Sequence, residues 1–206
     1  MLNFVYFDVG GVVIKDFSKT NKWNELQDEL GITSEKKPQF EKFWKDHEKE
    51  RCIGGDVEEL VPLLNKELRL SIPNTYSLLD GFVKRFEQNT SLWPAIERIK
   101  QSCRVGLLTN MYPRMLPEII KRNLLPPVEW DIIVDSSIEK CQKPEPKIFE
   151  IAEYKARVRG NKILFVENSE KHIEAAKKRN WHTFLYNPAD THKSNEALYT
   201  LFRSLR

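Results

Sequence analysis

The sequence predicts an α/β protein, with a mostly parallel sheet covered by helices on both faces and an inserted bundle of four helices. From about residue 94 onward, short apolar runs alternate with helical patterns, which is typical of βαβ units. Between residues 20 and 88, apolar residues recur only at helical spacing, so we expect no strand there. The run FVYFDV at residues 4–9 has the character of a buried strand, which places the first strand of the sheet before the helical insertion.

Four helices are expected in the insertion, because each set of apolar residues repeats at intervals of three or four. In chain order the sets are Trp23, Leu26 and Leu30; Phe40, Phe43 and Trp44; Val57, Leu60, Val61, Leu64 and Leu68; and Leu78, Phe82, Val83 and Phe86. Gly31, the turn at residues 54–56 and the turn at residues 72–74 separate them.

The second half of the chain continues the sheet and its covering helices. Strands are expected at residues 103–110, 131–135, 162–166 and 182–186, and helices at residues 94–101, 113–122, 146–158, 170–179 and 193–203. We therefore expect a core domain made of residues 1–16 and 90–206, and a helical cap domain made of residues 17–89.

Composition and charge indicate an ordinary globular protein. The 33 Lys and Arg residues nearly balance 30 Asp and Glu residues, which disfavours a nucleic-acid partner. No apolar run reaches the ~18 residues that a membrane span requires. The three cysteines have the spacing of neither a disulfide framework nor a metal pair, and the four histidines show no ligand spacing. We expect a cytoplasmic monomer or homodimer with no membrane contact, in which the histidines are structural or exposed to solvent.

Polar residues stand at the ends of the predicted strands, or in the loops that follow them. They are Asp8; Thr109 and Asn110; Lys143, in the loop after residues 131–135; and Glu167 and Asn168. Open parallel sheets bind ligands at the carboxyl ends of their strands, so these side chains are expected to meet. A carboxylate, a hydroxyl, an amide and a lysine suit phosphoryl transfer through a covalent aspartyl intermediate.

Four segments, FDVGGVV, LLTN, KPEPKIF and FVENSEKHIEAA, resemble in order and spacing the motifs of the haloacid dehalogenase-like (HAD) superfamily. The resemblance covers about residues 3 to 186. It implies a Rossmann-like core with a type-1 helical cap inserted after the first motif. Within the core it implies that Asp8 is the nucleophile and that Thr109, Asn110 and Lys143 stabilise the phosphoryl group.

The resemblance also implies a magnesium ion, with Asp8, the backbone carbonyl of Gly10, Glu167 and Asn168 around it. Val9, Gly10, Arg51 and Met111 are expected to contact the substrate. Lys15, Asp16, the CIGGD turn and Tyr112 are further candidates to meet the leaving group, by their position in the chain.

Two residues depart from the family pattern. Gly10 stands where most HAD phosphatases have an aspartate that protonates the leaving group, and loss of such an acid–base group costs roughly 10²–10⁴ in rate. Asn168 supplies an uncharged oxygen in place of a carboxylate, so we expect weakened magnesium binding. A subset resembling sugar-phosphate phosphatases has the same D-x-G and K-P-E patterns.

The leading hypothesis is a magnesium-dependent hydrolase that acts on a small phosphorylated metabolite, with sugar phosphates as one candidate class. The alternative is a catalytically impaired HAD fold that serves as a binding or regulatory protein. A dehalogenase is disfavoured, because that branch has an aromatic and a small hydroxyl residue where this chain has Gly10 and Val12.

Overall fold

The computed structural model describes residues 1–206 and contains a parallel five-stranded sheet with the strand order β5-β4-β1-β6-β7. The strands are β1 (Phe4–Phe7), β4 (Arg104–Thr109), β5 (Ile132–Asp135), β6 (Ile163–Glu167) and β7 (His182–Leu185). Their pairing is parallel throughout, with β1 between β4 and β6. The sequence prediction of a Rossmann-like α/β core is confirmed.

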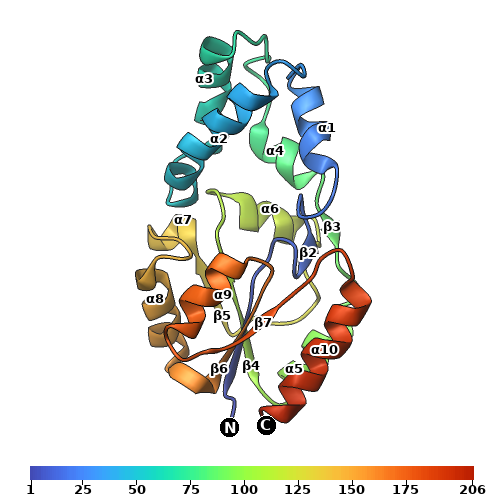
Figure 1. The fold of residues 1–206 in the computed structure, drawn as a ribbon, viewed down its shortest axis with the longest axis vertical. Helices are drawn as coiled ribbons and strands as arrows, with labels where there is room; N and C mark the ends of the chain where they lie inside the picture. The colour runs from blue at the N-terminus through green and yellow to red at the C-terminus, as the bar shows by residue number, and fades with distance from the viewer.

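Alternating side chains of β1 face two separate apolar clusters, one on each side of the sheet. Val5 and Phe7 face the larger cluster, which α5 (Trp93–Lys100), α6 (Met115–Lys121) and α10 (Thr191–Ser204) help to form. Phe4 and Tyr6 face the smaller cluster, beneath α8 (Pro146–Ala156) and α9 (Glu170–Lys177). Figure 1 shows α8 and α9 on one side of the sheet, and α5 and α10 on the other. Burial on both faces explains why the first strand is apolar at every position.

The helical insertion lies beyond the end of the sheet toward which β1 runs (Figure 1). It contains α1 (Lys22–Glu29), α2 (Lys37–Cys52), the short 3₁₀ helix η1 (Val57–Glu59), α3 (Leu60–Glu67) and α4 (Leu78–Val83). The four predicted helices are present, and we propose that residues 17–89 form the cap. None of the helices in the structure is both long and apolar enough to cross a membrane.

The structure also contains short elements that the sequence patterns did not predict. The prediction of no strand between residues 20 and 88 is wrong at β3 (Glu87–Gln88), which pairs antiparallel with β2 (Ile14–Lys15). Both β3 residues are exposed, so no apolar pattern signals this strand. The four-residue helix α7 (Ser136–Glu139) and the 3₁₀ helix η2 (Gly160–Lys162) are too short to show a helical period.

A buried hydroxyl connects the central strand to a covering helix. Tyr6 is fully buried, and its hydroxyl donates a hydrogen bond of 2.8 Å to the backbone carbonyl of Ala152 in α8. We expect Tyr6→Phe to lower the free energy of unfolding by about 1 kcal/mol, the net contribution of such a bond. Urea denaturation measures this change.

Tyr154→Phe is the matched control, because Tyr154 lies on α8, the helix that contains Ala152, and 81% of its surface is exposed. Its free energy of unfolding should equal that of the unchanged protein. Equal stability of all three proteins would contradict a contribution of the Tyr6 hydroxyl to the fold.

Candidate active site

A cavity of about 730 Å³ lies between the carboxyl ends of the central strands and the helical cap. Its lining includes most of the predicted site residues, namely Asp8, Gly10, Thr109, Asn110, Met111, Lys143, Glu167 and Asn168. Asp8 follows β1, Thr109 ends the neighbouring β4, and Glu167 ends β6 on the other side. The parallel order β4-β1-β6 therefore brings three distant chain segments to one edge.

Lys143 lies between two carboxylates in this cavity. Its Nζ is 2.8 Å from Oδ1 of Asp8 and 2.6 Å from Oε2 of Glu167. The lysine is only 2% exposed. A buried charge is stable only when it is paired, so these contacts hold the ammonium group beside Asp8.

Asn110 fixes the backbone that carries Lys143. Its Oδ1 accepts a hydrogen bond of 2.9 Å from the backbone N–H of Lys143, and its Nδ2 donates one of 3.0 Å to the Lys143 carbonyl. Both ends of the amide are thereby engaged, so Asn110 positions Lys143. Thr109 is also buried, but its hydroxyl makes no hydrogen bond inside the protein and remains available for a phosphoryl oxygen.

The three charged groups influence one another's protonation. Burial raises the pKa of Asp8, and Glu167 raises it further, while Lys143 acts in the opposite direction. Burial also disfavours the ionised form of Glu167, but Lys143 and His172 outweigh it and hold the pKa of that carboxyl below its usual range. Burial opposes the charge of Lys143, yet the two carboxylates raise the pKa of Lys143. Of the two carboxyl groups, Asp8 therefore takes up a proton more readily, because its pKa is raised and that of Glu167 is lowered.

Glu167 has no oxygen left over for a further ligand. Its Oε1 accepts hydrogen bonds from the backbone N–H groups of Asn168 and Ser169, at 2.9 and 3.0 Å. Its Oε2 contacts Lys143 and also Nδ1 of His172, at 3.0 Å. Glu167 therefore orients Lys143, and neither of its carboxylate oxygens is free to face the cavity.

His172 lines the cavity as well, although sequence reasoning assigned it only a structural role. Burial lowers the pKa of His172, against the effect of Glu167. A neutral ring that contacts a carboxylate through Nδ1 carries its proton on that atom. The position of His172, five residues after Glu167 on the following helix, was the signal that could have found it.

The loop after β1 packs tightly against the loop after β6. Gly11 has a φ of +71°, and a Cβ at this position would lie 2.0 Å from Nδ2 of Asn168. Only glycine suits both the backbone angle and the close approach. The side chain of Val9 is fully buried in the core, so any contact of Val9 with a substrate would involve its backbone.

Arg51, which we expected to contact the substrate, does not line the cavity. Its side chain is 6% exposed and forms an ion pair of 2.5 Å with Glu59. A Cβ on Gly55 would lie 2.8 Å from Nη1 of Arg51, which shows how closely the CIGGD turn packs on this arginine. The guanidinium at the end of α2 is therefore paired with a neighbouring segment of the helical insertion and not with a group at the cavity.

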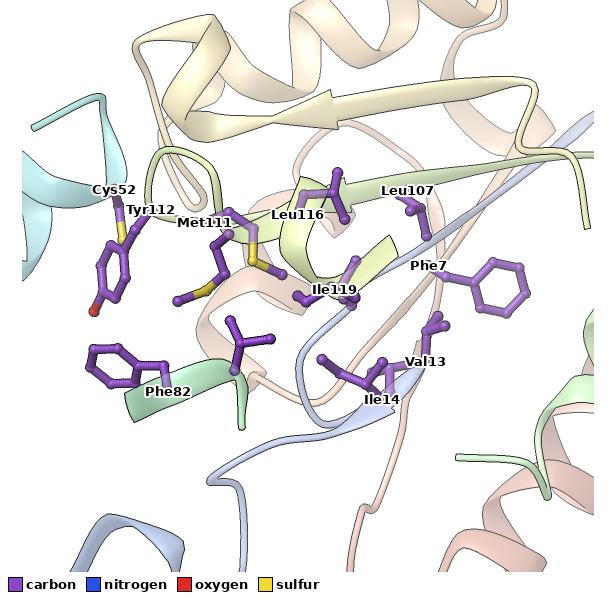
Figure 2. Close-up of a cluster of buried hydrophobic side chains, with 14 of the residues drawn as sticks. Phe7, Val13, Ile14, Cys52, Phe82, Leu107, Met111, Tyr112, Leu116 and Ile119 are labelled. Carbon is purple, nitrogen blue, oxygen red and sulfur yellow. The ribbon is translucent and has the colours of Figure 1, made fainter. Parts of the chain in front are cut away.

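Aromatic side chains form the wall of the cavity on the cap side. This wall consists of Phe17, Trp23, Trp44, Phe82, Phe86 and Tyr112. The ring of Trp44 lies 5.3 Å from those of Trp23 and Phe82. Figure 2 shows Met111 and Tyr112 reaching from the loop after β4 toward Cys52 and Phe82. The cavity is thus charged at the sheet and apolar at the cap.

The oxygen atoms at this site fit a magnesium ion, but only one of them carries a negative charge that is free of an ion pair. Lys143 occupies one oxygen of Asp8 and leaves the second free of ion pairs. Asn168 donates through Nδ2 to Oγ of Ser18 at 3.1 Å, which leaves its amide oxygen for a cation. No group of three or more His, Cys, Asp and Glu side chains has the arrangement of a metal site. Mg²⁺ commonly binds through one or two carboxylates together with substrate phosphate, which is the most this site offers.

Comparisons with known proteins agree with this architecture. A predicted HAD-like family hydrolase from Porphyromonas gingivalis has a similar structure, with a TM-score of 0.76, 20% identity and 98% of each chain covered. A HAD family enzyme from Bacteroides thetaiotaomicron, in complex with magnesium and inorganic phosphate, matches with a TM-score of 0.68 and 15% identity over 90% of this chain and 94% of that one. A 2-haloacid dehalogenase from Pseudomonas syringae matches with a TM-score of 0.63 and 14% identity over 99% of this chain and 100% of that one.

At these identities the solved structures show a shared fold. A comparison with curated protein sequences gives no match. The sequence model of the haloacid dehalogenase-like hydrolases matches residues 4–178, which is most of the chain. Together with the four strand-end motifs, this match shows that the chain belongs to the haloacid dehalogenase-like hydrolase family.

Proposed function

We propose that this protein is a magnesium-dependent phosphatase that hydrolyses small phosphomonoesters through an aspartyl-phosphate at Asp8. The observation that carries this proposal is the contact of Lys143 with both Asp8 and Glu167 in a cavity at the strand ends. The similar enzyme from Bacteroides thetaiotaomicron, crystallised with magnesium and inorganic phosphate, supports it.

In the first chemical step a carboxylate oxygen of Asp8 attacks phosphorus while the bond to the alcohol oxygen breaks. Lys143 and the free hydroxyl of Thr109 donate hydrogen bonds to the phosphoryl oxygens, where charge is concentrated in the transition state. A magnesium ion held by the second oxygen of Asp8, the backbone carbonyl of Gly10 and the amide oxygen of Asn168 would offset negative charge on the phosphoryl oxygens. Water then hydrolyses the aspartyl-phosphate and regenerates Asp8.

We expect the aromatic wall to contact the alcohol part of the substrate. Its rings face a cavity of about 730 Å³, enough for a small leaving group beside the phosphate. Flat rings bind the apolar face of such a group, including a sugar ring. Sugar phosphates therefore remain one class among the candidate substrates.

Two other functions are weaker candidates. Gly10 and Asn168, which replace two carboxylates of the family pattern, favour an impaired protein that binds ligands without turnover. The dehalogenases share the fold, but Val12 is fully buried away from the cavity and Gly10 carries no side chain.

The first prediction for the site tests the nucleophile. Asp8→Asn should reduce phosphate release by at least about 10³-fold across a panel of phosphomonoesters with Mg²⁺, because an amide is a poor nucleophile. Asp46→Asn, an exposed change on α2, is the matched control and should retain full activity. Absence of phosphate release from every substrate by the unchanged protein would instead favour the ligand-binding alternative.

The second prediction concerns Lys143. Lys143→Met should lower kcat by about 10²–10³, the usual loss when one transition-state donor is removed. The variant should also need a higher pH for activity, because removing the positive charge disfavours ionised Asp8 and raises its pKa. Lys147→Met, at an exposed site on the next helix, serves as the control. An unchanged pH profile would contradict this role.

The third prediction tests the weak magnesium site. Asn168→Asp adds a charged ligand and replaces the hydrogen bond that Asn168 donates to Ser18 by one that the Ser18 hydroxyl can donate, so it should tighten Mg²⁺ binding by about tenfold. The measurement is the thermal shift as a function of Mg²⁺ concentration, with and without inorganic phosphate. Asn74→Asp, exposed and remote from the cavity, makes the same charge change and should leave the binding curve unchanged.

A further inference from the structure

The proposed phosphatase needs a group that gives a proton to the departing alcohol oxygen, and Gly10 cannot supply one. Burial or ion pairing raises the pKa of Cys52, Tyr112 and Lys143 in the cavity lining, so these groups keep their protons. The other lining side chains that can exchange protons are Asp16, Glu41, Glu48, Glu167, Lys171 and His172. A suitable group must lie beside the nucleophile loop and keep one atom free of protein contacts.

Most of these groups do not meet both requirements. Glu167 uses both of its oxygens in hydrogen bonds, and neutral His172 directs its only N–H proton to Glu167. Glu41 and Glu48 are exposed on α2, on the cap side of the cavity. Lys171 is exposed on α9.

Asp16 meets both requirements. Its Oδ1 accepts a hydrogen bond of 2.8 Å from the backbone N–H of Ser18, while its Oδ2 makes no hydrogen bond within the protein. A Cβ built on Gly10 would lie 2.5 Å from this Oδ2. That separation is close to the one between Cβ and a carboxylate oxygen within an aspartate side chain. Asp16 thus places a carboxylate oxygen in the space where a side chain of residue 10 would extend.

The backbone of the loop produces this placement. The carbonyl of Val9 accepts hydrogen bonds from the N–H groups of Val12 and Ile14, and Gly10 forms a β-bridge with Ile14. Asn89 donates to the Val12 carbonyl at 2.7 Å and secures the turn. The chain therefore folds back on itself, which brings Asp16 beside Gly10.

We propose that Asp16 is the general acid–base residue of this site, and that residue 10 is glycine because the Asp16 carboxylate occupies its side-chain space. This inference rests on the proposed phosphatase function. As the Asp8–phosphorus bond forms and the phosphorus–alcohol bond breaks, the proton on Asp16 passes to the alcohol oxygen. The Asp16 carboxylate then takes a proton from water, whose oxygen attacks phosphorus and releases Asp8. The sum is an alcohol and inorganic phosphate from ester and water.

The test compares leaving groups that do and do not need a proton. With alkyl phosphates, Asp16→Asn should lower the rate of alcohol release by about 10²–10⁴. With p-nitrophenyl phosphate the leaving group departs unprotonated, so the variant should release p-nitrophenolate in a rapid burst. Slow turnover follows, because the water-activating base is missing, and mass spectrometry should detect phosphorylated Asp8.

Asp28→Asn, an exposed change on α1, is the control and should behave as the unchanged protein does. Equal losses by Asp16→Asn in the first-turnover rate of alcohol and of aryl release, or no loss on either substrate, would overturn the role of Asp16. If turnover by the unchanged protein still depends on Asp8, the proposed function stands and only this inference fails. If no phosphate is released at all, the proposed function fails first.

A second pair of variants tests the shared space directly. Gly10→Asp alone should lower activity, because its Cβ meets Asp16. Gly10→Asp combined with Asp16→Ala moves the carboxylate from one residue to the other, and should be more active than Asp16→Ala alone. A rate increase from Gly10→Asp in the otherwise unchanged chain would show that the space is open and would overturn the proposal.

Discussion

The arrangement of the site depends on one buried ammonium group that balances two carboxylates. Lys143 comes from the loop before α8, whereas Asp8 and Glu167 come from neighbouring strand ends. Burying these charges costs several kcal/mol for each ion unless their contacts are close and complete. The parallel register of β1 and β6 acts together with the two hydrogen bonds between Asn110 and the Lys143 backbone, because each helps to bring the opposite charges within contact distance.

Glycines in the loop after β1 make room for groups that come from elsewhere. Gly11 admits the amide of Asn168, and Gly10 admits the carboxylate of Asp16. In both cases a Cβ would lie closer than van der Waals contact allows to a polar atom at the cavity. A residue without a side chain can therefore be as specific a choice as a charged one, because it determines which neighbour occupies the space.

The cavity combines two kinds of surface that come from different parts of the fold. Strand ends of the sheet supply the charged groups, and the cap supplies most of the aromatic wall around Trp44 and Phe82. Apolar surroundings exclude water and strengthen the electrostatic interactions of the charged cluster. The apolar cluster on one face of the sheet continues into the cap, so the wall is also part of the packing that holds the two regions together.

The sequence by itself determined the α/β core, the four cap helices, and the meeting of Asp8, Thr109, Lys143 and Glu167 at one edge of the sheet. Apolar periodicity and strand-end position are local properties, and parallel pairing makes them sufficient to bring Asp8, Thr109 and Glu167 together. Lys143 reaches the same edge from a loop, which Asn110 holds in place. Only the tertiary structure decided that Arg51 pairs with Glu59 rather than facing the cavity, that His172 contacts Glu167, and that Asp16 lies beside Gly10. These three contacts depend on how distant segments pack together and on how the loop after β1 folds back. No periodicity in the sequence predicts them.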